Sequence, residues 1–133
     1  MKISTDYPPN YRDILEALGE QEGAVFCYGD TIYNPFHVNI LPDIEVHEAV
    51  HMRQQGENVP VWYHRYLTEP AFRLEQELEA YGKQYAFVKK RVPGPLRKWR
   101  LNQTCLALSG REYGYLLSYH QAEKLIKQYG ATA

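Results

Sequence analysis

The segment from Asp43 to Gln55 constrains the fold more than any other part of this 133-residue chain. Asp43 is a suitable N-cap and Gly56 a suitable C-terminal stop, so the segment is predicted to be a helix. Its H-E-x-x-H run places His47 and His51 four residues apart, about 40° apart on one face. Two imidazoles in this register can bind one Zn²⁺, with the intervening Glu placed to take a proton from a zinc-bound water.

The environment of this pair on the helix favours a metal site. His47 and His51 share their face with Ile44 and Val50, so this face is expected to point into the protein. Glu48 lies at the border of the same face, within reach of a ligand held by the histidines. The alternative is that both are ordinary part-buried histidines beside a solvated Glu48. The pairing at four-residue spacing makes the metal site the preferred interpretation.

A catalytic zinc normally has three protein ligands and an open position for water. The downstream candidates for the third ligand are His64, Glu69, Glu75, Glu77 and Glu79. A long helix is predicted over 69–91, with an apolar stripe of Leu74, Leu78, Tyr81, Tyr85 and Val88. Glu77 flanks this stripe, whereas Glu75 and Glu79 point away from it. A carboxylate beside a buried stripe is unfavourable unless paired or metal-bound, so Glu77 is our choice. A salt bridge to Arg73 is the alternative role for Glu77, and His64 is the second choice of ligand.

The whole chain predicts one α+β domain over residues 1–133, mainly helical, with a small antiparallel sheet before the motif helix. The other helices are expected at 11–18, 59–67, 69–91, 96–108 and 118–129. The strands are expected at 24–28, 31–33 and 36–40. Val92-Pro93-Gly94-Pro95 is the clearest break, and residues 111–117 carry no decisive pattern.

Charge and composition exclude several classes of function. With 15 basic and 16 acidic residues, the net charge is −1, which argues against nucleic-acid or membrane binding. No apolar run is long enough for a membrane span, and the N-terminus lacks the apolar core of a signal peptide. A cytoplasmic protein is expected, in which Cys27 and Cys105 are buried thiols; one disulfide is the alternative. The sequence does not indicate the oligomeric state.

His47-Glu48-Ala49-Val50-His51, followed by Glu77-Leu78-Glu79-Ala80, resembles the two-helix signature of gluzincin-type metallopeptidases. More closely, the chain resembles small phage-encoded zinc metallopeptidases in segments 47–55, 62–81 and 108–114, which lie within a span of about half its length. The resemblance implies a minimal zincin-like fold and assigns the third zinc ligand to Glu77, which agrees with the position of Glu77 beside the apolar stripe. Where one version of the signature continues with Asp, this chain has Tyr81, so no supporting carboxylate is expected there.

The implied activity is zinc-dependent hydrolysis of peptide bonds, with Glu48 as general base on a zinc-bound water. Tyr81, one turn beyond the third ligand, is the candidate for stabilising the oxyanion, with Tyr113 and Tyr115 as alternatives. The partner would be a peptide or protein substrate, which strand 36–40 could hold by edge pairing. A second hypothesis is a non-catalytic binding or assembly protein that retains the zinc site. A third, a helical domain with an accidental motif, predicts no metal.

Overall fold

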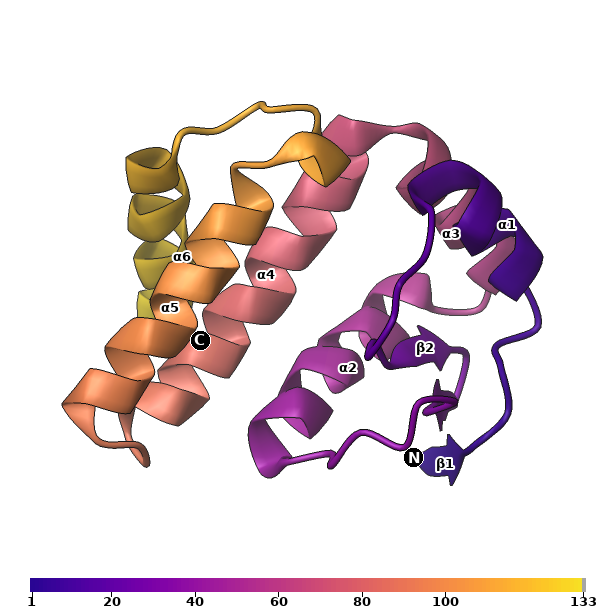
Figure 1. Cartoon of the computed structure of the whole chain (residues 1–133), viewed down its shortest axis with the longest axis horizontal. Helices are drawn as coiled ribbons and strands as arrows, with labels where there is room; N and C mark the ends of the chain where they lie inside the picture. Colours follow the sequence, from indigo (N-terminus) through magenta and orange to yellow (C-terminus); the bar gives the residue numbers. More distant parts are fainter. Residues whose placement is uncertain (133) are drawn as a thin grey trace. The chain divides into compact units, whose positions relative to one another are not determined.

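The computed structural model describes residues 1–132, which form six α-helices, one 3-10 helix and three short strands (Figure 1). In chain order they are β1 (Lys2–Ser4), α1 (Tyr11–Leu18), β2 (Phe26–Tyr28), β3 (Thr31–Tyr33), α2 (Pro42–Gln55), α3 (Val59–Thr68), α4 (Pro70–Lys89), α5 (Gly94–Leu108), η1 (Arg111–Tyr113) and α6 (Tyr119–Thr132). The predicted class, α+β and mainly helical, is confirmed. Within this fold the chain divides into two compact units, Met1–Glu69 and the residues from Pro70 on. None of the described helices is long and apolar enough to cross a membrane.

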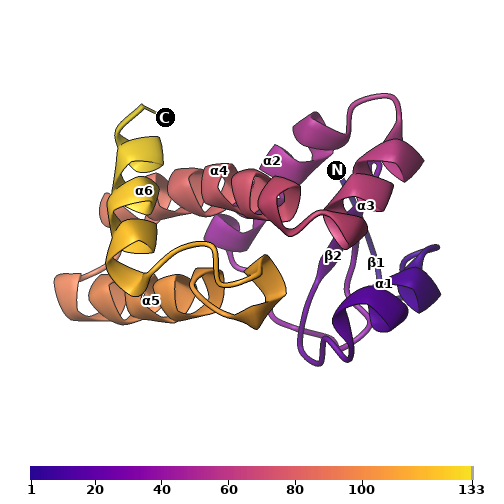
Figure 2. The same ribbon diagram turned by 90° about the horizontal axis from the view of Figure 1, so that it is seen from above.

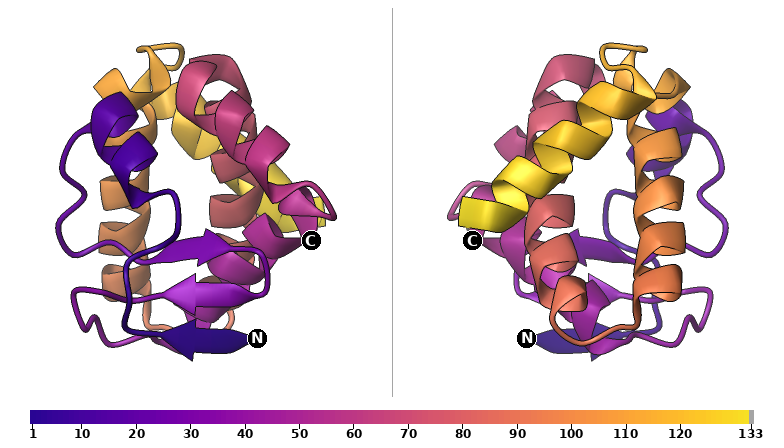
Figure 3. Two further views of the ribbon diagram at one scale, coloured as in Figure 1. Left: turned by 90° about the vertical axis from the view of Figure 1, so that its right-hand side faces the viewer. Right: turned by 90° about the vertical axis from the view of Figure 1, so that its left-hand side faces the viewer.

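The sheet belongs to the first unit and has the strand order β1-β3-β2, which Figure 3 shows with β3 in the middle. Strands β2 and β3 form the predicted antiparallel hairpin, with Cys27 opposite Ile32. Gly29, at φ 63°, supplies the left-handed conformation that the tight turn needs. Strand β1 was not predicted, and it pairs parallel to β3, with Ile3 opposite Ile32. The sheet is therefore mixed, and the expectation of purely antiparallel pairing is corrected.

The predicted strand over residues 36–40 is wrong, because this segment is a turn followed by irregular chain. The Asn34 side chain folds it back on itself: Oδ1 accepts from the Val38 N–H, and Nδ2 donates to the Val38 carbonyl, both at 2.9 Å. His37 has φ 55°, which lies outside the β region. The segment therefore offers no strand edge to a peptide.

Helix α2 carries the H-E-x-x-H run and begins at Pro42, where the fixed φ of proline suits the first helical position. Leu41 is the N-cap and makes no side-chain capping bond, so the prediction of Asp43 as the cap is wrong. Asp43 instead lies in the first turn and is buried. The helix ends as predicted at Gly56, whose φ is 55° and whose N–H donates to the Met52 carbonyl at 3.2 Å.

Helices α3 and α4 are separate because Glu69 precedes Pro70. The residue before a proline is driven out of the helical region, and Glu69 has φ −118° and ψ 98°. The long helix therefore spans Pro70–Lys89, rather than beginning at Glu69 and reaching Arg91. The side chain of Glu69 pairs with Arg65 one turn earlier, with Nε and Oε2 at 3.1 Å.

The second unit packs α4, α5, η1 and α6 around one core, made of Leu74, Leu78, Leu101, Cys105, Leu108, Tyr113, Ala122 and Ile126. Ser118 and Gln121 form a reciprocal capping box at the start of α6, with bonds of 3.2 and 2.8 Å. Helices α4 and α6 approach closely (Figure 2), and a Cβ on Gly82 would lie 2.3 Å from the Tyr129 Cβ. Gly130, predicted to end α6, lies inside it.

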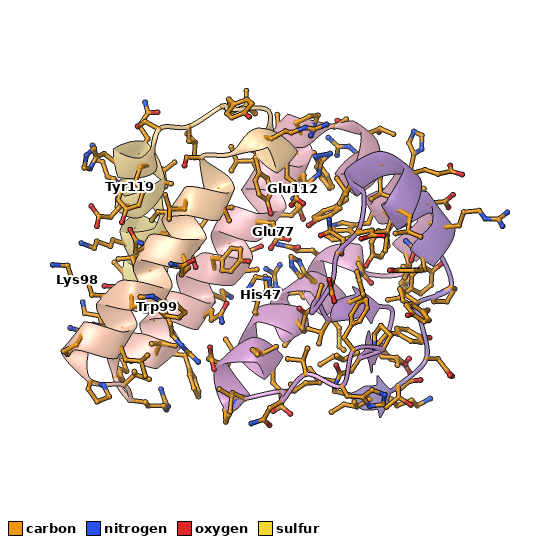
Figure 4. The ribbon with its side chains drawn as sticks, in the orientation of Figure 1. His47, Glu77, Lys98, Trp99, Glu112 and Tyr119 are labelled. Carbon is orange, nitrogen blue, oxygen red and sulfur yellow. The ribbon has the colours of Figure 1, made fainter. Side chains whose placement is uncertain are left out.

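The near-neutral total charge conceals opposite charges on the two units. The first unit carries 11 Asp or Glu against four Lys or Arg, a formal charge of −7. The second carries five against 11, a formal charge of +6. Lys98 and Trp99 extend from α5 in this basic unit (Figure 4), and Trp99 is 58% exposed.

Candidate metal centre

The two motif histidines lie side by side on α2 and are both buried. Their Nε2 atoms are 3.1 Å apart, and the rings meet edge to face with centroids at 4.8 Å. Two zinc–nitrogen bonds of about 2.0–2.1 Å at a tetrahedral angle hold the nitrogens about 3.3 Å apart. His47 and His51 are therefore spaced for a single tetrahedral ion. Two nitrogen lone pairs this close repel each other unless a proton or a cation lies between them.

Gln54 determines which nitrogen of His51 is free to bind. The Nδ1–H of His51 donates to Gln54 Oε1 at 2.8 Å, which leaves the lone pair on Nε2, the atom that faces His47. A hydrogen bond of this kind fixes the tautomer and ring orientation of a metal-binding histidine. No role for Gln54 was predicted from the sequence. Its position three residues after His51, on the same side of the helix, was the available signal.

Aromatic side chains of α3 enclose the His51 ring. Trp62 lies 5.6 Å from it, and Tyr66 lies 6.4 Å from it, both measured between ring centroids. Trp62 and Tyr66 also stack on each other at 4.8 Å. This packing restricts rotation of the imidazole and excludes water from one side of it.

The C-terminal end of α2 is anchored to the β2–β3 turn by a buried glutamine. Gln55 Nε2 donates to the Cys27 carbonyl, and Gln55 Oε1 accepts from the Gly29 N–H, both at 2.8 Å. The Tyr63 hydroxyl from α3 donates to the same Cys27 carbonyl at 2.6 Å. The sheet, α2 and α3 are thus joined at one carbonyl, which holds the histidine-bearing helix in a defined position.

Glu48 is only 6% exposed, so its alternative description as a solvated charge is contradicted. Burial, followed by the charges of Glu48 and Asp30, raises the pKa of the Cys27 thiol. The Glu48 carboxylate is therefore within electrostatic reach of the thiol, inside the first unit.

Glu77 lies on α4, in the second unit, and is also buried at 6% exposure. The predicted stripe is confirmed, since Leu74, Leu78 and Val88 are buried and the two tyrosines are partly buried. Glu75 is exposed, as predicted, and Glu79 is half-buried. Glu77 is therefore the one fully buried carboxylate among the candidates on this helix.

Among residues 1–132, one group of buried side chains could hold a metal ion: His47, His51 and Glu77. Each offers one ligand atom: an imidazole nitrogen from each histidine and a carboxylate oxygen from Glu77. Figure 4 shows His47 extending from α2 and Glu77 from α4. All three predicted ligands are thus buried side chains. His64 is not part of this group, because it is exposed and lines a pocket elsewhere in the first unit.

The neighbours of Glu77 include two of the candidate tyrosines. Burial, then the nearby Glu77 and Tyr81, raise the pKa of Tyr113 well above its usual value, so its phenol keeps its proton. Tyr81 packs against the core one turn beyond Glu77. Tyr115 is 71% exposed. Arg73, the salt-bridge partner considered for Glu77 as the alternative to metal binding, donates from Nη1 to the backbone carbonyl of Glu112.

The two cysteines are buried free thiols, as the sequence analysis expected. Burial raises the pKa of the Cys105 thiol to about 11. Both are therefore protonated at neutral pH, and the disulfide alternative is contradicted.

Comparison of the chain with protein-family models, with curated proteins and with solved structures found no significant match. The function of the site is therefore argued from its own geometry.

Proposed function

We propose that this chain is a zinc metallopeptidase of the gluzincin type. The observation that carries the proposal is the 3.1 Å separation of the His47 and His51 Nε2 atoms, and the buried Glu77 of α4 is the proposed third ligand. Two imidazoles and one carboxylate form the donor set of a catalytic zinc, which leaves a fourth position for water. Mg²⁺ and Ca²⁺ prefer sets made of oxygen atoms, so they fit this site poorly.

Glu48 is the proposed general base. A zinc ion at this site would lower the pKa of a bound water and polarise a peptide carbonyl. Glu48 would take the proton of the attacking water and return it to the leaving amine. Its burial supports this role, because water exclusion strengthens charge interactions around a carboxylate.

Tyr81 is the proposed donor to the developing oxyanion, with Tyr113 as the alternative. Both belong to the unit that carries Glu77, and the raised pKa of Tyr113 favours the protonated, donating form of that phenol. The substrate would be a peptide or protein in the cytoplasm, of the host cell if the chain is phage-encoded. Nucleic acid and membrane are not proposed as partners.

The test combines metal analysis with peptide cleavage. The purified protein should contain zinc and should cleave a peptide library, with products identified by mass spectrometry. Glu48→Gln should retain zinc and lose cleavage, whereas Glu77→Ala should lose both. Glu75→Gln is the matched control, because it alters an exposed acid on the same helix and should retain both.

Each alternative outcome has a distinct meaning. Zinc without cleavage in the native protein would favour the non-catalytic, metal-stabilised binding or assembly protein. Full cleavage by Glu48→Gln would contradict the assignment of the base. A protein that takes up no zinc would contradict both functions.

A further inference from the structure

A pocket of about 560 Å³ lies in the first unit, walled by α1, α3 and the end of β2. Helices α1 and α3 lie side by side in the structure (Figure 1). The volume is in the range of pockets that hold small ligands or single side chains, about 300–1,000 Å³.

The pocket lies on a different face of α3 from the histidine pair. Trp62 and Tyr66 contact His51, whereas the pocket is lined by His64 and Leu67 of the same helix. At about 100° per residue, these two pairs point to different sides of the helix. A ligand in the pocket would therefore not touch the proposed zinc ligands.

The walls combine an aromatic surface with an acidic rim. Tyr28 and Tyr63 stack with ring centroids 5.6 Å apart and planes at 16°, and both line the pocket. Asp13 and Glu16 stand three residues apart on α1, so their carboxylates share one face of that helix. No Lys or Arg is among the residues that line the pocket. An aromatic wall beside two carboxylates favours a cation carried on an apolar stem.

An unpaired polar side chain also belongs to this pocket. Asn10 lines it, and both polar atoms of its carboxamide, Nδ2 and Oδ1, are buried without a hydrogen-bond partner. Asn10 occupies the N-cap position of α1 and makes no capping bond with its side chain. Buried polar groups are normally satisfied, so this orphaned carboxamide gains hydrogen bonds if it turns toward a polar ligand in the pocket.

We propose that this pocket binds a guanidinium or ammonium group on an apolar stem, as carried by an arginine or lysine side chain of a peptide. The −7 formal charge of the unit attracts such a cation, and the stem packs on the tyrosine wall. The carboxamide of Asn10 bonds to the peptide group or to the cation. The pocket is thus a binding site for basic peptide segments, and it does not depend on the proposed metal chemistry.

The test is a titration of the full-length, isotope-labelled protein followed by amide NMR shifts. Nα-acetyl-arginine amide is the probe, Nα-acetyl-citrulline amide is its neutral isostere, and agmatine, which keeps the guanidinium but lacks the peptide groups, tests whether those groups contribute. The arginine probe should shift amides of residues 10–17 and 60–68, with a Kd of about 1–10 mM, as expected for contacts of this strength. Citrulline amide should bind at least about fivefold more weakly. Agmatine should bind more weakly than the arginine probe if the peptide groups contribute to binding. It should bind equally well if the pocket recognises the cation alone, and either result supports the site.

Variants distinguish binding in the pocket from general attraction of a cation to the negatively charged unit. Asp13→Asn with Glu16→Gln should weaken binding about fivefold, whereas Glu20→Gln with Glu22→Gln should leave it unchanged. The control pair removes the same charge from the same unit, outside the pocket. Asn10→Ala should also weaken binding. Equal loss in both double variants, equal binding of citrulline amide, or no shift with about 20 mM arginine probe would overturn the proposal. Zinc content and cleavage are read separately, so failure here leaves the proposed function standing.

Discussion

Replacing Gln54 tests how the site prepares His51 for a metal. In Gln54→Leu the side chain keeps nearly the same size but loses the oxygen that accepts from His51 Nδ1 at 2.8 Å. The His51 ring is 6% exposed, so the abandoned N–H lies in a buried environment with restricted access to water. Loss of such a supporting bond weakens metal affinity about 10- to 100-fold, which corresponds to about 1.4–2.7 kcal/mol.

The measurement is a zinc titration in competition with a fluorescent chelator at neutral pH. Gln54→Glu is the matched control, because its carboxylate keeps an acceptor for the same N–H and should bind zinc at least as tightly as the native protein. Circular dichroism of each variant checks that α2 is still formed. Arg53→Gln, an exposed neighbour on the same helix, should leave zinc affinity unchanged.

One result would refute this reasoning. If Gln54→Leu binds zinc as tightly as the native protein, the hydrogen bond does not determine the nitrogen that His51 presents. An equal loss in Gln54→Glu would show that shape at position 54, rather than the acceptor, is what the site requires.

Three further predictions concern the framework of the molecule. Gly82→Ala should lower the free energy of unfolding by about 1–3 kcal/mol in denaturant titrations, because the new methyl would overlap Tyr129; unchanged stability would contradict the close approach of α4 and α6. Tyr63→Phe should cost about 0.5–1.5 kcal/mol in the same assay, since the Cys27 carbonyl keeps its bond from Gln55; a loss above about 3 kcal/mol would require another explanation. The Cys105 thiol should react slowly with a disulfide reagent at neutral pH and faster as the pH rises to about 11, and fast reaction at pH 7 would contradict its burial. Because the pKa of this thiol is higher in the folded than in the unfolded chain, the free energy of unfolding should fall as the pH rises from about 9 to about 11.

The helices could be predicted largely because periodic apolar positions and proline or glycine stops act locally. The boundary at Pro70 was one residue off, since the predicted start at Glu69 ignored the restriction that proline places on its predecessor. The segment 36–40 alternates like a strand, but side-chain bonds from Asn34 to Val38 override that pattern. Strand β1 is only three residues long, and parallel pairing with a distant strand leaves no local signal.

The candidate site was predictable to the extent that helix geometry determines it. Spacing places His47 and His51 on one face, and the stripe of α4 selects Glu77 over its exposed neighbour. Gln54 was missed because several polar residues surround His51 in sequence, and only the fold decides which of them accepts from its ring. The separate pocket was missed because it joins α1 to α3 across a long stretch of chain, and neither helix alone indicates a cavity.

The central claim is that His47, His51 and Glu77 hold one zinc ion. Zinc-edge X-ray absorption on the protein, combined with elemental analysis, tests it most directly. We predict about one zinc per chain, bound by two imidazole nitrogens and by oxygen at about 2.0–2.2 Å, with no sulfur ligand. The oxygen signal should fall in Glu77→Ala, and the bound zinc should be lost or greatly reduced. A sulfur shell near about 2.3 Å, a single imidazole, or full zinc content in Glu77→Ala would contradict the claim.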